Sequence, residues 1–133
     1  WLAARIREID RFVGELPSIA VLVNSEDDVV PVSEALAEAL EDQNIRVTAC
    51  RNGQVKGSEG SVRVFNVEHI KGLEFEAVFF LEVDGLLKLH SDLFNKYLYV
   101  GATRAATYFG VTCRGALPQK LQSLRSAFCD KWE

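Results

Sequence analysis

The sequence lacks several features that would assign it to a special class of protein. Its three cysteines, at positions 50, 113 and 129, never form a C-x-x-C pair. Neither a disulfide framework nor a zinc site is therefore predicted, and we expect reduced, buried packing residues. Apolar runs such as 19–23 and 77–81 are far shorter than the ~20 residues of a membrane-spanning helix. With no basic-then-apolar leader at the start, we expect a cytoplasmic protein.

Three further absences concern function. The chain has no methionine and begins at Trp1, so we expect it to be part of a longer protein. The phosphate-loop pattern G-x-x-x-x-G-K-[ST] occurs nowhere, not even in the glycine-containing polar loop at 51–61, so the element that cradles nucleotide phosphates is missing. The net charge of −4 argues against a domain that binds nucleic acid by bulk electrostatics, although it permits local contacts.

The composition that remains is ordinary for one soluble globular domain, with 133 residues, 48% of them hydrophobic and 26% charged. An amphipathic pattern predicts a leading helix over residues 1–17. The continuous apolar run Ile19 to Val23 is typical of a strand covered on both faces. A second helix is predicted from about Pro31 to Gln43. Its buried stripe is expected at Val32, Leu36, Ala39 and Leu40, and its solvated acidic face at Glu34, Glu38, Glu41 and Asp42.

The rest of the chain continues the alternation of strands and helices. Further strands are predicted at 45–50, 62–67, 77–83 and 107–113, with Asp84-Gly85 closing the third of these. One helix is expected after Ser91-Asp92, and a last one from Pro118 to residue 133, with Leu121, Leu124 and Phe128 facing inward. No internal repeat is visible. This order predicts a single α/β domain with a mostly parallel sheet, whose core spans residues 19–115.

Two polar stretches stand out from this framework. The first, His69-Ile70-Lys71-Gly72-Leu73-Glu74-Phe75, leads directly into the apolar run 77–81. The second, from Tyr97 to Ala105, is a helical pattern that ends in Thr103 and Arg104. Polar groups at the mouth of a buried strand are where α/β proteins bind their ligands, so functional residues are expected here.

Taken together, the two stretches resemble the last two signature motifs of superfamily 1 helicases of the UvrD/Rep type. In that family the C-terminal RecA-like domain carries a K-G-x-E-F segment followed by a Y-V-x-x-T-R-A segment. The order, the spacing and the intervening strand all agree. Larger members insert a subdomain ahead of the first segment, whereas here the loop at 51–61 bridges the gap, so the chain resembles the compact form.

The resemblance implies a three-layer RecA-like domain of the P-loop NTPase type. It also implies an ATP site in the cleft between this domain and an N-terminal RecA-like domain, which would hold the phosphates and the Mg²⁺. No metal site is expected on this chain. The other implied partner is single-stranded DNA.

Arg104 matches the family's arginine finger, the candidate catalytic residue. A guanidinium aimed at the transferring phosphoryl group stabilises charge that develops in the transition state. The alternative is a cation near a helix C-terminus, where positive charge is favoured in any protein.

Gly72 and Glu74 are the other candidates for the nucleotide site. Glu74 matches the glutamate that contacts the ribose, and its alternative is an exposed carboxylate at the start of a strand. Gly72 suits a backbone that approaches nucleotide closely or adopts positive φ.

His69 and Lys71 are the candidates for contact with nucleic acid. His69 matches the family histidine on the DNA side of the turn, and its alternative is a partly buried histidine that holds the turn. Lys71 lies in the same motif, and its contact could be phosphate, a carboxylate or solvent. His90 matches no motif position and is expected in a loop.

The chain departs from the family pattern at three positions. Asn24 stands after the first strand where many relatives carry an arginine that faces the nucleotide phosphates. Val67 stands where a threonine often touches DNA, which would weaken the grip on the strand. Gly101 replaces an alanine or serine, a change we expect to be harmless.

The resemblance therefore implies the C-terminal motor domain of an ATP-dependent DNA helicase or translocase, inactive by itself because it supplies half of an ATP site. The alternative is a degenerate helicase-like module that acts in DNA binding or protein docking without ATPase activity. A free-standing nucleotide-binding α/β protein is a third reading, which the missing phosphate loop disfavours.

Overall fold

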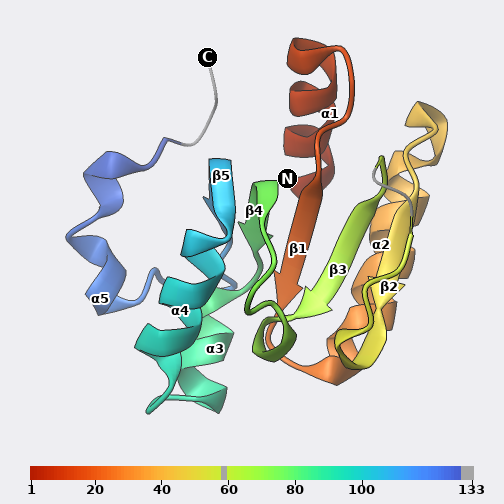
Figure 1. Ribbon diagram of the computed structural model, residues 1–133. Helices are drawn as coiled ribbons and strands as arrows, with labels where there is room; N and C mark the ends of the chain where they lie inside the picture. Colours follow the sequence, from red (N-terminus) through yellow and green to blue (C-terminus); the bar gives the residue numbers. More distant parts are fainter. Residues whose placement is uncertain (58–59, 130–133) are drawn as a thin grey trace.

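A five-stranded parallel sheet forms the centre of the molecule. In the computed structural model, residues 1–57 and 60–129 are described. The strand order is β2-β3-β1-β4-β5, and every pairing is parallel (Figure 1). The strands are β1 Ile19–Val23, β2 Val47–Cys50, β3 Val62–Asn66, β4 Phe75–Phe80 and β5 Ala105–Val111. The predicted three-layer α/β class is confirmed, and within the described residues the sheet is wholly parallel.

Helices cover both faces of this sheet. On one face α1 (Leu2–Val13) and α2 (Val29–Leu40) pack against alternate residues of β1, β3 and β4. On the other face lie α3 (Val83–Leu89), α4 (Phe94–Thr103) and the short α5 (Gln119–Gln122) (Figure 1). Single 3₁₀ turns occupy Glu26–Asp28, Glu41–Gln43, Arg51–Gly53, Val67–His69 and Arg125–Ala127.

The central strand β1 explains why two layers of helices are needed. All five of its residues are buried, with exposures of 0 to 3%. A strand whose successive side chains point to opposite faces can be this apolar only when both faces are covered. The continuous run of residues 19–23 therefore predicted the position of β1 correctly.

The two helices on the first face agree with their predicted patterns except in detail. Helix α1 ends at Gly14, whose φ of +75° is a left-handed cap, rather than at Pro17. In α2 the predicted acidic face is exposed, but Ala39 is exposed as well, and Val29 and Ser33 are buried instead.

The segment after β4 differs most from the prediction. The strand ends at Phe80 rather than Val83, and helix α3, which was not predicted, begins at Val83. Glu82 adopts a left-handed conformation with φ of +52° and so breaks the extended chain. Its carbonyl accepts a 2.8 Å hydrogen bond from Asn24 Nδ2, and its N–H donates to Thr112 Oγ1 at 2.9 Å.

Two other predictions need correction. Strand β5 starts two residues earlier than predicted. The single last helix is wrong over the described residues: α5 is one turn, a 3₁₀ turn follows at Arg125–Ala127, and Leu124 is 50% exposed. Residues 130–133 of that predicted helix, like 58–59 of the predicted loop, lie outside the described part. Of the cysteines, only Cys50 is buried.

Asp84 ties the start of α3 to the chain after β5. Its carboxylate oxygens accept hydrogen bonds from the backbone N–H groups of Arg114, at 3.0 Å, and Gly115, at 2.9 Å. Burial raises the pKa of this carboxyl group, but the backbone donors, from Gly115 and Arg114 first, outweigh burial and leave the pKa below its ordinary value.

We therefore predict that Asp84→Asn destabilises the fold at neutral pH by about 1 kcal/mol, the typical loss for a hydrogen-bonded partner. Because the folded-state pKa is lowered, the carboxylate contributes its full stability above the unfolded pKa of about 3.9 and loses it as pH falls through the folded value. Urea unfolding should therefore separate the variant from wild type at pH 7 and bring the two together near pH 2.5. If the difference in unfolding free energy between Asp84→Asn and wild type did not change with pH, this account would be contradicted. Asp27→Asn, at an exposed carboxylate, is the control.

Candidate functional site

The first signature stretch crosses the sheet from one edge to the other. Strands β3 and β4 are parallel and separated by β1, so residues 67–74 must return the chain from the carboxyl ends of the strands to their amino ends. We call these two sides the carboxyl edge and the amino edge. Val67 and Ile70 are buried in the same core cluster as Ala20 and Leu22 of β1 and fasten the crossover to the sheet.

At the amino edge the structure brings Glu74 and Arg104 together. The N–H of Phe75 donates a 2.9 Å hydrogen bond to the carbonyl of Arg104, and Phe75 is paired with Ala105 at the start of the β4–β5 ladder. Glu74 and Arg104 are the residues at which the chain enters these two neighbouring strands. Two motifs that lie about thirty residues apart in the sequence thus meet at one point of the sheet.

The guanidinium of Arg104 is held by a neutral partner. Its Nη2 donates to Thr103 Oγ1 at 3.3 Å, whereas its Nε is buried and has no partner among the described residues. No ion pair of Arg104 is found within 1–57 and 60–129. Arg104 is also the C-cap of α4, so the alternative reading, a cation at a helix C-terminus, describes its position too. What that reading leaves open is the absence of an anionic partner for Arg104 among the described residues.

The strand that follows Arg104 is irregular. The ladder pairs Phe75 with Ala105 but Ala77 with Tyr108, so residues 106 and 107 of β5 lie opposite the single residue Glu76. This β-bulge is fixed by a hydrogen bond from Thr107 Oγ1 to the Glu76 carboxylate. Bulges redirect the neighbouring chain and are frequent beside functional sites.

The other residues of the first motif are open to solvent. Lys71, Gly72 and Glu74 are all exposed, and neither Lys71 nor Glu74 has a hydrogen-bond or ion-pair partner in the described part of the chain. Gly72 has φ of +84°, which only glycine adopts readily, and no atom lies within 4 Å of the position a Cβ would take. The glycine is thus required by backbone conformation, and the space in front of it is free.

His69 lies at the carboxyl edge, away from Glu74 and Arg104. The six residues of β4 alone separate the two edges by about 17 Å, at roughly 3.3 Å per residue. His69 Nε2 is 3.8 Å from Glu26 Oε2, and a Cβ on Gly53 would come within 3.2 Å of the His69 side chain. The histidine is half-exposed and contacts two other loops. Its exposure fits a contact with DNA, and its neighbours fit a histidine that holds the turn.

Glu26 is a neighbour of His69 that the motifs did not indicate. Its Oε1 accepts a 2.6 Å hydrogen bond from the N–H of Asn52, which fixes the carboxylate beside the imidazole. Glu26 lies in the 3₁₀ turn after β1, together with Asp27 and Asp28. The acidic run at 26–28 was visible in the sequence, but nothing local places it next to residue 69.

Asn24, the position of the missing arginine, also lies at the carboxyl edge. It is 5% exposed and donates to the Glu82 carbonyl. A side chain there cannot share a site with Arg104 at the opposite edge of this domain.

His90 lies outside regular secondary structure, as expected for a loop residue, and directly follows α3. It is the C-cap of α3, and its Nε2 is 3.6 Å from Glu68 Oε1. The Tyr97 hydroxyl donates to the same oxygen at 3.5 Å, and burial and the Glu68 charge raise the pKa of Tyr97. Glu68 thereby links α3 and α4 beneath the signature turn.

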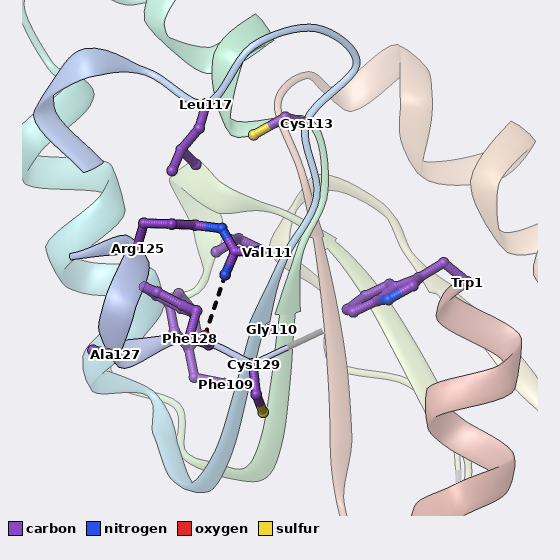
Figure 2. Close-up of a pocket in the computed structure, with 10 residues that line it drawn as sticks. All are labelled: Trp1, Phe109, Gly110, Val111, Cys113, Leu117, Arg125, Ala127, Phe128 and Cys129. Carbon is purple, nitrogen blue, oxygen red and sulfur yellow. Dashed lines mark hydrogen bonds between the residues drawn. The ribbon is translucent and has the colours of Figure 1, made fainter. Parts of the chain in front are cut away.

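One pocket among the described residues lies away from both motifs. A cavity of about 290 Å³ beside β5 is lined by Trp1, Phe109, Phe128 and Arg125 among others, with Arg125 Nη1 donating to the Phe128 carbonyl at 3.2 Å (Figure 2). None of the five predicted site residues lines it. Over the described ranges, no group of three or more potential metal ligands is gathered. No described helix is both long and apolar enough to cross a bilayer.

Comparison with known proteins agrees with the two motifs. Residues 61–112 match the family model of the UvrD-like helicase C-terminal domain. This range contains both signature stretches from β3 to the end of β5, so the predicted resemblance is confirmed. No curated protein sequence matches the chain significantly.

Two solved structures share the fold. One is the C-terminal domain of a possible DNA helicase from Lactobacillus plantarum WCFS1, with a TM-score of 0.64 and 22% identity, over 91% of this chain and 69% of that one. The other is a hypothetical ATP-dependent RNA helicase from Sulfolobus tokodaii, with a TM-score of 0.63 and 14% identity, over 98% of this chain and 43% of that one. The domain therefore has the RecA-like fold of helicase C-terminal domains.

Proposed function

We propose that the chain is the C-terminal motor domain of an ATP-dependent DNA helicase or translocase of the cytoplasm. It would supply an arginine finger, Arg104, and a ribose contact, Glu74, to an ATP site completed by an N-terminal RecA-like domain. The observation that carries this proposal is the pairing of Phe75 with Ala105. It brings to the same edge a guanidinium and a carboxylate that have no ion-pair partner among the described residues.

The amino edge fits one side of a nucleotide rather than all of it. Arg104 has no ion pair in the described residues, Glu74 offers an exposed acceptor, and the space at Gly72 is open. A planar guanidinium can donate to two phosphate oxygens at once. No phosphate loop and no carboxylate cluster accompany them in the described residues. Bound Mg²⁺ would neutralise charge on the phosphates, and its ligands are expected on the N-terminal domain.

The carboxyl edge is the proposed contribution to the track for single-stranded DNA. His69 and Lys71 lie on the same crossover as Glu74, so a movement of this short segment would act on both edges. Closing of the cleft on ATP and opening after hydrolysis would then change the grip on DNA in each cycle. Because the buried residues of the crossover fix it to β1, the two edges would move together with the domain.

Arg104→Ala in the longer protein that carries this chain tests the finger. Turnover should fall by about 10³-fold or more, because the charge that develops on the phosphoryl group loses its partner. ATP binding should change little, since the phosphates are held mainly by the other domain. Steady-state ATPase kinetics and a separate nucleotide-binding titration measure the two effects.

Two further variants sharpen this test. Arg104→Lys keeps the positive charge but lacks the planar guanidinium, so most of the loss of ATP turnover seen in Arg104→Ala should remain. Arg46→Ala removes an exposed arginine elsewhere on the domain and should leave turnover unchanged. Normal ATP turnover in Arg104→Ala would contradict the assignment of Arg104 as an arginine finger.

One observation favours the second candidate function, a helicase-like module for docking without ATPase activity. Glu26 lies beside His69 and is held there by Asn52, and Asp27 and Asp28 follow it. Carboxylates at this position repel DNA phosphates and weaken the proposed DNA contact. An acidic carboxyl edge would suit a basic protein partner better than a DNA strand.

Glu26→Gln separates the two functions at this edge. The amide keeps an acceptor for the Asn52 N–H but removes the charge, so DNA affinity should rise roughly two- to fivefold, as for an exposed charge pair. Fluorescence anisotropy with labelled oligothymidylate at low salt measures it, with Glu34→Gln on the exposed face of α2 as the charge-matched control. Equal affinities for the two variants, or no binding by either, would contradict a DNA role for His69.

A further inference from the structure

Thr103, the last residue of α4, makes three polar contacts through its hydroxyl. Its Oγ1 lies 2.8 Å from the Tyr99 carbonyl and 3.2 Å from the Val100 carbonyl, and it also lies 3.3 Å from Arg104 Nη2. A hydroxyl has one proton and two lone pairs. Its proton is taken by a helix carbonyl, so the lone pairs are available to the guanidinium.

From these contacts we propose that Thr103 is a positioning residue for Arg104, which holds the guanidinium in place before nucleotide arrives. The inference rests on the proposed function, since it gives a role to Arg104. In the described residues the Thr103 hydroxyl is the only side-chain acceptor that Arg104 contacts. Without it, the guanidinium tip beyond the buried Nε would lose its side-chain hydrogen bond.

The chemistry of the partner matters for this role. A carboxylate in place of the hydroxyl would also hold Arg104, but it would neutralise the charge needed at the phosphoryl group. A hydroxyl orients the guanidinium and leaves its positive charge and its other N–H donors free. Orientation fixed before binding lowers the reorganisation needed in the transition state.

The backbone of Arg104 is fixed independently of its side chain. Its carbonyl accepts from Phe75 N–H, and its own N–H lies 3.2 Å from the Gly101 carbonyl. The bulge at residues 106–107 follows directly. The Cα of Arg104 is thus fixed by the sheet and the helix, while Thr103 fixes the tip of the side chain. Removing the Thr103 hydroxyl should therefore loosen the tip without moving the Cα.

The Arg104 Nε–H group provides a direct probe in the 133-residue chain, because it is buried. ¹⁵N relaxation should give this group a high order parameter in wild type. Thr103→Val, which is nearly isosteric, should lower it below about 0.6, the range of flexible groups. Thr103→Ser keeps the hydroxyl and should preserve the wild-type value.

Thr112→Val is the matched control. Thr112 Oγ1 also accepts a hydrogen bond, from Glu82 N–H at 2.9 Å, but at the opposite edge of the sheet. This variant should lose some stability and leave the Arg104 order parameter unchanged. A wild-type order parameter in Thr103→Val would overturn the proposal, as would an equal drop in Thr112→Val.

Turnover in the longer protein gives the second readout. Thr103→Val should lower kcat about tenfold with KM for ATP unchanged, as expected for the loss of one hydrogen bond that acts in the transition state, and Thr103→Ser should restore it. If Arg104→Ala abolishes turnover but Thr103→Val does not lower kcat, the positioning role fails while the finger stands. If Arg104→Ala is itself fully active, the proposed function fails first, and with it the role of Thr103.

Discussion

The hydrogen bond from Phe75 N–H to the Arg104 carbonyl is the constraint on which the proposed site depends. It begins the β4–β5 ladder, and it makes the residues that precede the two strands neighbours at the amino edge. Glu74 and Arg104 need no direct contact to be brought together, because the sheet does it. Because β3 and β4 both run parallel to β1, residues 67–74 must cross the whole sheet, so that His69 lies at the other edge. The strand pairings together thus account for the meeting of the two motifs and for the division of the first motif between two edges.

At the amino edge, Arg104 and Glu74 have no ion-pair partner among the described residues. The chain contains enough carboxylates to pair Arg104, yet in the described residues its side chain contacts only a hydroxyl. An arginine paired with a carboxylate would gain stability in the isolated domain and lose availability to phosphate. An incomplete site of this kind is what the missing phosphate loop predicts for one half of a shared cleft. The carboxyl edge shows the opposite pattern, since Glu26 already faces His69.

The fold could be predicted largely from the sequence because its strongest signals are local. The apolar run 19–23 and the periodic pattern of α1 follow directly from burial on two faces and on one face. Helix α3 was missed because its start depends on a left-handed Glu82, which is stabilised by Asn24 and Thr112 from distant parts of the chain. The end of the chain was over-predicted as a helix because Leu121, Leu124 and Phe128 have helical spacing, although only Leu121 is buried.

The sequence indicated candidate site residues but not their geometry. The two motifs identified Arg104, Glu74, Gly72, His69 and Lys71, and the comparisons confirm the family resemblance of that segment. Their roles stay predictions. The separation of His69 from Arg104 could not be predicted, because it depends on strand order. The contacts of Glu26 and Thr103 could not be predicted either, because they depend on how side chains are placed in the folded chain.

The central claim, that this chain is half of an ATP site, is tested most directly by ATP turnover of the longer protein with and without single-stranded DNA. The isolated chain is measured beside it. The account predicts hydrolysis that is stimulated by DNA in the longer protein and no hydrolysis by the isolated chain. Turnover by the isolated chain, or an inert longer protein under both conditions, would contradict it.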